Sequence, residues 1–288
     1  MKRALTALSV LAIALFVPAS ALATDYAPPD QPGPALSVPR AALEASLTCA
    51  GNLSSGARGP VLLVPGTAYS PKSDFSWNWE PALHKLGIPW CVVALPGNGM
   101  GDVQTAAEYV VNGIRTMYLD ADVVCIPGCA PSFWQQADRS AFIKALNSYA
   151  ETFPGISYTV AYTRLDEVVV PNLNAQGSSA LHGGGGEISN VAVQEVCPLD
   201  LSEHLAIGTY DPVAYALAID AISHPGPADP SRLAGTGVCR RLFMPGVNPL
   251  TFATDELSSV AAVGATVATY PRVPAEPPLR CYVTADCP

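Results

Sequence analysis

Short apolar runs that end in a Pro-Gly pair predict the first strands of a parallel sheet. Residues 60–64 read PVLLV and residues 89–95 read PWCVVAL, and each run stops at Pro-Gly. Continuous apolar runs of this length are typical of strands that are buried on both faces. Residues 81–86, between the two runs, suit a short helix. Strand, helix and strand in this order favour an α/β fold.

The alternation continues along the rest of the chain. Residues 102–119 predict a helix, because Asp102 can cap the first turn and the apolar side chains that follow recur at helical spacing. Similar patterns predict helices at residues 138–150, 211–223 and 254–268, and strands at residues 123–126, 158–162 and 190–196. We therefore expect a single α/β domain over residues 45–288, since about 250 residues are enough for one buried core.

The N-terminal segment has the composition of a secretory leader. Lys2 and Arg3 precede an apolar run over residues 4–17, and small residues two apart follow it, as at a cleavage site. The run is too short to cross a bilayer, which takes about 20 residues. We expect residues 1–23 to be a signal peptide, residues 24–44 a proline-rich arm, and the protein to be secreted without a stable membrane anchor.

The charge balance is acidic. The chain has 15 basic and 24 acidic residues and a formal net charge of −9; loss of the leader removes two basic residues and makes the charge −11. Nucleic-acid binding needs a basic surface, so we expect no nucleic-acid partner. A small molecule is the expected partner, and we expect the protein to be a monomer.

Eight cysteines in an exported chain indicate disulfides rather than metal ligands. Two intervals are equal at 42 residues, from Cys49 to Cys91 and from Cys197 to Cys239. The remaining cysteines form two close pairs, Cys125 with Cys129 and Cys281 with Cys287. A zinc site is the alternative, but the chain lacks a second Cys-x-x-Cys-like cluster or a His pair at ligand spacing. Spacing alone leaves the pairing open.

Asp166 and His204 stand in the order of the acid and the base of an α/β-hydrolase triad. Asp166 follows a predicted strand, and His204 lies on a later predicted loop. Acyl transfer by a serine enzyme needs an imidazole that takes a proton and a carboxylate that orients the imidazole. Each residue taken singly would more often be an exposed loop side chain. In this order and context, the two together predict an acid–base pair.

Motifs along most of the mature chain resemble those of secreted lipases, in the family that includes fungal lipase B of Candida antarctica and its bacterial relatives. The motifs are Leu47-Thr48-Cys49, Leu63-Val64-Pro65-Gly66-Thr67, Asn78-Trp79, Cys91, residues 107–112, 131–136 and 166–169, Val196-Cys197 and the loop to His204. The resemblance implies a three-layer α/β-hydrolase fold and ester hydrolysis by ping-pong acyl transfer, with no cofactor and no metal.

The resemblance also implies individual roles. Asp166 would be the triad acid, His204 the base, and Thr67 a donor to the oxyanion. Val168 and Val169 would be walls of the substrate pocket. The implied disulfides are Cys49–Cys91, Cys197–Cys239 and Cys281–Cys287. No counterpart is assigned to Cys125 and Cys129.

The chain departs from that family where the nucleophile belongs. Roughly fifty residues, on the scale of a 250-residue domain, are missing between Ala121 and Asp122. In the family this block carries the central strand, the serine turn and the second oxyanion donor. Its loss would leave neighbouring strands with unpaired edges, so we expect poor folding or loose packing.

No other serine has the sequence of a nucleophile elbow. Ser178 and Ser179 come after the acid, in a glycine-rich loop, and Ser132 is followed by bulky Phe133. Ser54 and Ser55 precede the first strand. We expect a secreted lipase or esterase by descent that is inactive as the chain stands. The alternatives are a non-catalytic acyl- or lipid-binding protein and a truncated gene product.

Overall fold

The computed structural model describes residues 26–27, 35–51, 53, 60–114, 130–137 and 140–285. The expected signal peptide, the expected strand at residues 123–126 and the proposed break after Ala121 lie outside the described residues. So do Ser54, Ser55, Cys125, Cys129 and Cys287.

The first sheet has three strands in the order β1-β3-β2, where β1 is Leu47–Ala50, β2 is Val61–Leu63 and β3 is Trp90–Val93. The central strand β3 runs parallel to β2 and antiparallel to β1, and all four of its residues are buried. The two apolar runs of the sequence therefore form β2 and β3, as predicted.

Helices cover both faces of this sheet. The cluster on one face joins it to α2 (Pro71–Phe75) and α3 (Trp79–Leu86), and its buried members are Leu63, Phe75, Leu83, Ile88, Trp90 and Val92. The cluster on the other face joins it to α4 (Val103–Ile114), and it contains Leu62, Cys91, Val93 and the partly buried Tyr109. A sheet with helices on both faces is the three-layer arrangement of α/β proteins.

Local signals set the ends of these helices. A capping box between Ser70 and Ser73 starts α2, and Gly87, with a φ of 65°, ends α3 in the left-handed region. The carboxylate of Asp102 accepts the backbone N–H of Gln104 at 3.0 Å at the start of α4. The remaining elements around this sheet are α1 (Arg40–Ala45), η1 (Pro96–Gly99), α5 (Pro131–Gln135) and α6 (Ala141–Leu146).

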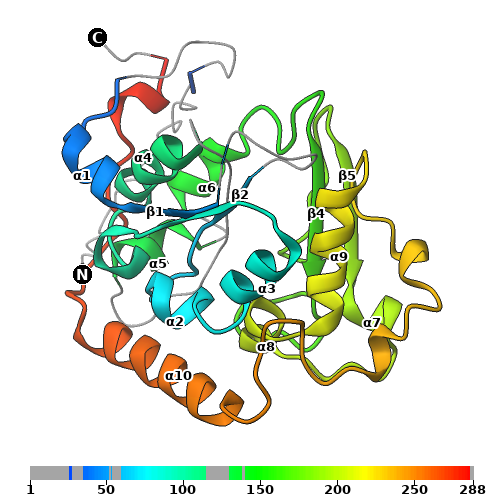
Figure 1. Cartoon of the computed structure of the whole chain (residues 1–288). Coiled ribbons are helices and arrows are strands. Elements are labelled where there is room, and N and C mark those ends of the chain that lie inside the picture. Colours follow the sequence, from blue (N-terminus) through cyan, green and yellow to red (C-terminus); the bar gives the residue numbers. More distant parts are fainter. Residues whose placement is uncertain are drawn as a thin grey trace, which may run out of the picture.

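A second sheet contains β4 (Ser157–Tyr162) and β5 (Glu187–Ala192), which run parallel. The strand predicted at residues 190–196 was wrong beyond Ala192, because Val193–Val196 form the helical turn α7. Among the described residues no strand pair joins the two sheets. Figure 1 shows the two sheets side by side. We call the part of the chain built around β1, β2 and β3 the first half, and the part built around β4 and β5 the second half.

The second half is held together by its own core. Helix α9 (Pro212–Ser223) lies along β4 (Figure 1), and its residues Val213 and Leu217 are fully buried. The same core includes Val191 of β5 and Val193 of α7. The other elements of the chain are α8 (His204–Thr209), η2 (Pro230–Leu233), η3 (Val238–Arg240), α10 (Phe252–Thr269) and η4 (Cys281–Val283).

The N-terminal arm and the C-terminal segment meet on α4. The side chain of Glu108 is 8% exposed and pairs with Arg280 at 2.6 Å. It also accepts the hydroxyl of Ser37 at 2.6 Å and the backbone N–H groups of Ser37 and Val38. We call these four residues the Glu108 clamp. The clamp fixes the described part of the arm to the domain.

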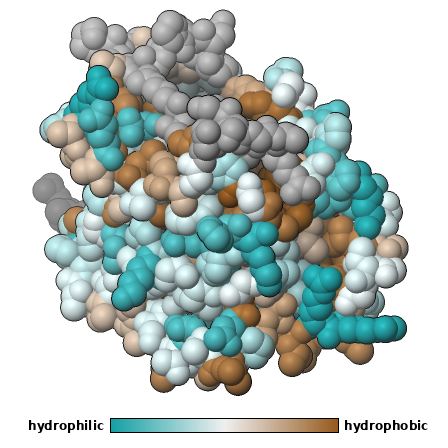
Figure 2. Space-filling model, in the orientation of Figure 1, coloured by the Kyte–Doolittle hydropathy of each residue, from teal (hydrophilic) through white to brown (hydrophobic). Residues whose placement is uncertain are grey.

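The surface mixes polar and apolar groups. On the face shown in Figure 2, hydrophilic and hydrophobic residues are interspersed. Within the described part of the chain, the segment His204–Ser223 is long and apolar enough to span a membrane by length and composition. It consists of α8 and α9, and half of it is buried inside the fold, as in a core helix.

Candidate active site

Asp166 lies on the turn that follows β4. Its carboxylate oxygen Oδ1 accepts the backbone N–H groups of Val168 at 3.0 Å and Val169 at 2.8 Å. The side chain is 6% exposed. These bonds fix the carboxylate, and they give the two valines a local role besides the pocket role that the resemblance implies.

His204 is the first residue of α8, not a loop residue. The side chain of Glu203 caps this helix by accepting the backbone N–H groups of Leu205 at 2.7 Å and Ala206 at 3.1 Å. The imidazole atom Nδ1 lies 3.0 Å from Oδ1 and 3.1 Å from Oδ2 of Asp166. With Asp166 ionised, Nδ1–H donates to the carboxylate, and Nε2 is then free to act as a base.

The two groups shift each other's protonation. The hydrogen bond to Asp166 raises the pKa of His204; burial opposes this, and the charges of Asp166, Glu167 and Glu203 add to it. Burial raises the pKa of Asp166, but the bonds from His204, Val169 and Val168 outweigh burial and leave that pKa below its ordinary value. The carboxylate therefore stays charged and orients a readily protonated imidazole.

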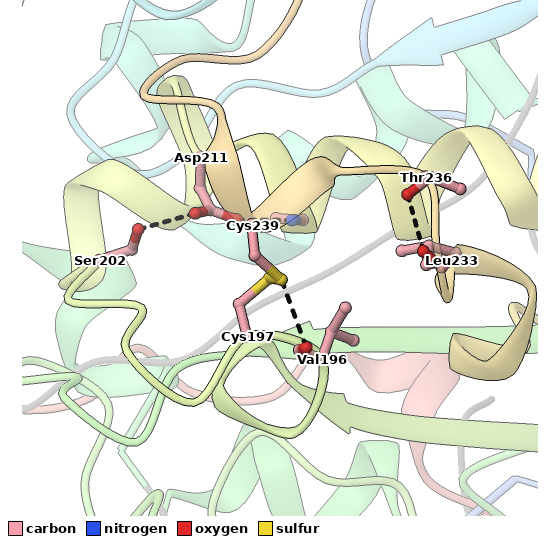
Figure 3. Close-up of a disulfide and its surroundings, with 8 residues drawn as sticks. Val196, Cys197, Ser202, Asp211, Leu233, Thr236 and Cys239 are labelled. Carbon is pink, nitrogen blue, oxygen red and sulfur yellow. Dashed lines mark hydrogen bonds between the residues drawn. A yellow bond between two sulfur atoms is a disulfide. The ribbon is translucent and has the colours of Figure 1, made fainter.

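The loop before His204 is fixed at both ends, as Figure 3 shows for the disulfide Cys197–Cys239 and for Ser202. The hydroxyl of Ser202 donates to Asp211 at 2.7 Å, and the backbone carbonyl of Ser202 accepts the hydroxyl of Thr163 at 2.6 Å. Thr163 directly follows β4. His204 is thereby tied to the strand that leads to Asp166.

Thr67 lies on the loop after β2, in the first half of the chain. Its hydroxyl accepts the side-chain amide of Gln136 at 2.9 Å, and Gln136 is buried. The preceding amide, that of Gly66, donates to Asp74 at 2.8 Å. Among the described residues the Thr67 backbone N–H has no hydrogen-bond partner. An amide without a partner is what an oxyanion donor requires.

Sequence reasoning gave no role to Gln136. The residue lies in the motif of residues 131–136 that carried the resemblance, yet its partner is 69 residues away. Nothing in the local pattern indicates this contact. The structure places Gln136 directly after α5, with its amide at Thr67.

The charge of Glu203, directly before α8, acts on Tyr69, which lies close to Thr67 in the chain. Burial raises the pKa of Tyr69, and the negative charges of Asp74, Glu256 and Glu203 add to the effect. Glu203 precedes His204 in the chain, and Tyr69 follows Thr67 by two residues. The two loops therefore lie within electrostatic range of each other.

No described serine completes the pair. Within the described ranges, no hydroxyl forms a hydrogen bond with Nε2 of His204. Ser132 is fully buried in α5 and its hydroxyl has no hydrogen-bond partner there. Ser179 accepts a hydrogen bond from Asn172 at 2.9 Å in the loop after Asp166, and Ser178 is exposed beside it.

Two cavities and the disulfide-bonded cysteines lie away from Asp166 and His204. A cavity of about 530 Å³ is lined by residues of η2, η3 and α7, and one of about 230 Å³ lies at the end of α3; neither is lined by Asp166 or His204. The disulfide Cys49–Cys91 links facing residues of β1 and β3. Cys281 is disulfide-bonded. Among the described residues no group of three or more His, Cys, Asp or Glu could hold a metal ion.

Comparison with known proteins finds similarity to lipases in both sequence and fold. No family model matches the chain. Lipase B from Pseudozyma antarctica is 28% identical over 227 residues, a match that covers 61% of this chain and 65% of that protein. The crystal structure of Aspergillus fumigatus lipase B superposes with a TM-score of 0.76 at 25% identity, covering 88% of this chain and 74% of that one. The chain is related to the lipase B proteins.

This similarity agrees with the fold described above. The superposition agrees with the expected α/β-hydrolase-like fold, in which helices flank the sheets. The chain spans just under two thirds of the length of the curated lipase B that it matches.

Proposed function

We propose that the chain is a secreted protein on a lipase or esterase scaffold that keeps an acid–base pair and an oxyanion donor but no serine nucleophile. The observation that carries the proposal is the contact between Nδ1 of His204 and Asp166 at 3.0 Å, while Nε2 meets no hydroxyl among the described residues. Its substrates would be carboxylic esters, lipid esters among them.

The alignment with lipase B supports the proposal that a block of residues is missing from this chain. It extends over 227 positions, but only 61% of the 288 residues, about 176, take part in it. About 50 positions of the relative therefore have no residue of this chain opposite them. A deletion of this size is what the sequence pattern indicated between Ala121 and Asp122.

In a complete site, each described residue would have a defined task. His204 Nε2 would take the proton of the nucleophile and pass it to the leaving alcohol, and Asp166 would hold the imidazole and stabilise its charged form. The Thr67 amide and hydroxyl would donate to the oxyanion. Without a nucleophile, His204 can only activate water, and acyl-enzyme chemistry is lost.

Two assays test the proposal. The purified chain should not be labelled by a fluorophosphonate probe and should hydrolyse p-nitrophenyl esters at a rate near the uncatalysed one. Labelling of any serine, found by peptide mass spectrometry, would show that a nucleophile exists. Insertion of a serine elbow with its strand and helix between Ala121 and Asp122 should restore hydrolysis, and His204→Ala should abolish it in the restored protein.

An acyl-binding protein without catalysis is the second candidate. Such a protein needs an apolar cavity at the old site, and neither cavity given above is lined by Asp166 or His204. Saturable binding of a fatty ester without turnover would favour it.

Export is supported by the disulfides Cys49–Cys91 and Cys197–Cys239, which persist in oxidising compartments.

A further inference from the structure

The candidate site draws its residues from both halves of the molecule. Thr67 follows β2 of the first sheet, and His204 follows β5 of the second. Among the described residues no strand pair connects these sheets. The separation of the oxyanion donor from the base must therefore be set by other contacts.

A buried amide makes such a contact. Asn78 is fully buried, and its Nδ2 donates to the backbone carbonyl of Asp74 at 2.8 Å and to that of Thr209 at 2.8 Å. Its Oδ1 accepts the backbone N–H of Trp79. Both Nδ2 protons are thus used, one for each half of the molecule. Thr209 lies 131 residues further along the chain, at the end of α8.

The path continues on either side of Asn78. Towards the first half, the carboxylate of Asp74, a residue that is 6% exposed, accepts the Gly66 amide at 2.8 Å, directly before Thr67. Towards the second half, the Thr209 hydroxyl donates to the Leu205 carbonyl at 2.6 Å within α8, the helix that His204 begins. One hydrogen-bonded path therefore runs from the Thr67 loop to the His204 helix.

We propose that Asp74 and Asn78 are positioning residues that hold the loop bearing Thr67 in register with the helix bearing His204. The proposal rests on the proposed function, because it assigns these residues to that site. Neither residue takes part in proton transfer. Asp74 holds the peptide group before Thr67 through the Gly66 amide, and Asn78 holds α8, the helix that begins at His204, through the Thr209 carbonyl.

The charge of Asp74 supplies a spectroscopic signature. Burial raises the pKa of this carboxyl group to about 7, and the Gly66 hydrogen bond opposes the rise. The titratable group that interacts with Asp74 is Tyr69, on the loop before α2, and the charges of Glu203 before α8 and Glu256 on α10 act on the same tyrosine. A carboxylate accepts a hydrogen bond more strongly than the neutral acid does. The Gly66 amide resonance should therefore move as pH passes through 7.

Hydrogen exchange of Asn78→Ala tests the bridge. Peptides covering residues 66–74 and 204–210 should exchange faster by about tenfold or more, because buried carbonyls lose their donor. Peptides covering β4 should change far less. The matched control is Asn172→Ala, which removes another buried asparagine, bonded to Ser179, and should leave both bridge peptides unchanged. A uniform rise over all peptides of Asn78→Ala would overturn the proposal.

NMR of the unmodified chain gives a second test that does not need Asn78→Ala to fold. The Gly66 amide should titrate near pH 7, and Asp74→Asn should abolish that titration. A Gly66 resonance that is flat from pH 5 to 9 would overturn the role of Asp74. Neither measurement uses turnover. Labelling by a fluorophosphonate probe would refute the absence of a serine nucleophile, whereas the exchange and NMR results decide the positioning role separately.

Discussion

The Glu108 clamp gives the sharpest stability prediction. Glu108→Gln keeps the size of the side chain but removes its charge and one of its two acceptor oxygens. In the native protein one oxygen receives the backbone N–H groups of Ser37 and Val38, and the other receives the Ser37 hydroxyl and Arg280. The glutamine amide must turn its own donors towards one of these sets. At least two hydrogen bonds to a charged acceptor are lost.

The magnitude follows from the burial of the partners. Hydrogen bonds to charged groups contribute about 1.5–3 kcal/mol each. The Arg280 side chain is 28% exposed, so water recovers part of its interaction. We expect the free energy of unfolding of Glu108→Gln to fall by about 2–4 kcal/mol.

The effect should depend on pH in a defined direction. Burial raises the pKa of Glu108, but its bonds from Ser37, Val38 and Arg280 outweigh burial and lower that pKa from the ordinary 4.5. A carboxyl group with a lowered folded pKa contributes stability above its unfolded pKa, and this stability is lost as pH falls through the folded pKa. The difference in the free energy of unfolding between the native protein and Glu108→Gln should be largest at pH 7 and should shrink below pH 4.5.

Urea denaturation followed by tryptophan fluorescence measures the difference. The matched control is Glu44→Gln, which breaks the exposed pair Arg40–Glu44, with side chains 89% and 57% exposed. Exposed pairs of this kind contribute little to stability, so Glu44→Gln should leave the urea midpoint nearly unchanged. If both variants unfold at the same urea concentration as the native protein, the clamp does not stabilise the fold. Limited proteolysis should also cut the arm near Ser37 faster in Glu108→Gln only.

Three further predictions concern single residues. Asp166→Asn should lower the pKa of His204 towards its ordinary value near 6.5, seen by NMR titration of the ring protons, and an unchanged titration would refute the pairing. The stability that His204 gains from this pair is present below pH 6.5 and is lost as pH rises through the folded pKa of His204. Arg232→Ala should lower the urea midpoint, because it leaves the carboxylate of Asp220, 6% exposed, without its guanidinium partner; Asp220→Asn in the Arg232→Ala background should recover part of the loss in the same urea assay. Leu83→Ala should cost about 2–5 kcal/mol, because the side chain is fully buried, and a thermal midpoint within 2 °C of the native one, roughly 0.5 kcal/mol, would contradict this.

The sequence predicts elements well where burial is uniform or periodic. Strand β3 is buried at all four residues, and a continuous apolar run marks it. Strand β1 escaped prediction because only its end residues are partly buried and both middle residues are exposed. The error after Ala192 has another cause: valines at positions 191, 193 and 196 favour a strand, although the chain is helical over Val193–Val196. Run length alone does not separate a strand from a short helix.

In the candidate site, too, the sequence predicts some features and misses others. The order of acid and base along the chain pointed to Asp166 and His204, which are 38 residues apart, but their contact could be seen only in the folded chain. Gln136 and Asn78 have partners 69 and 131 residues away. Contacts at such separations leave no periodic trace in one sequence. The roles of Asp166, His204, Thr67, Val168 and Val169 remain predictions.

The two 42-residue disulfide loops bear on how the chain is oxidised. Cys49–Cys91 closes within the first half, Cys197–Cys239 closes within the second, and the loops do not overlap along the chain. Each thiol pair can therefore combine as soon as its own half has collapsed, without waiting for the other. Any non-native pairing among these four cysteines would have to link the first half of the chain to the second. Early oxidation should thus yield species with one native bond each, and cross-linked isomers should collect only when both halves are still unfolded.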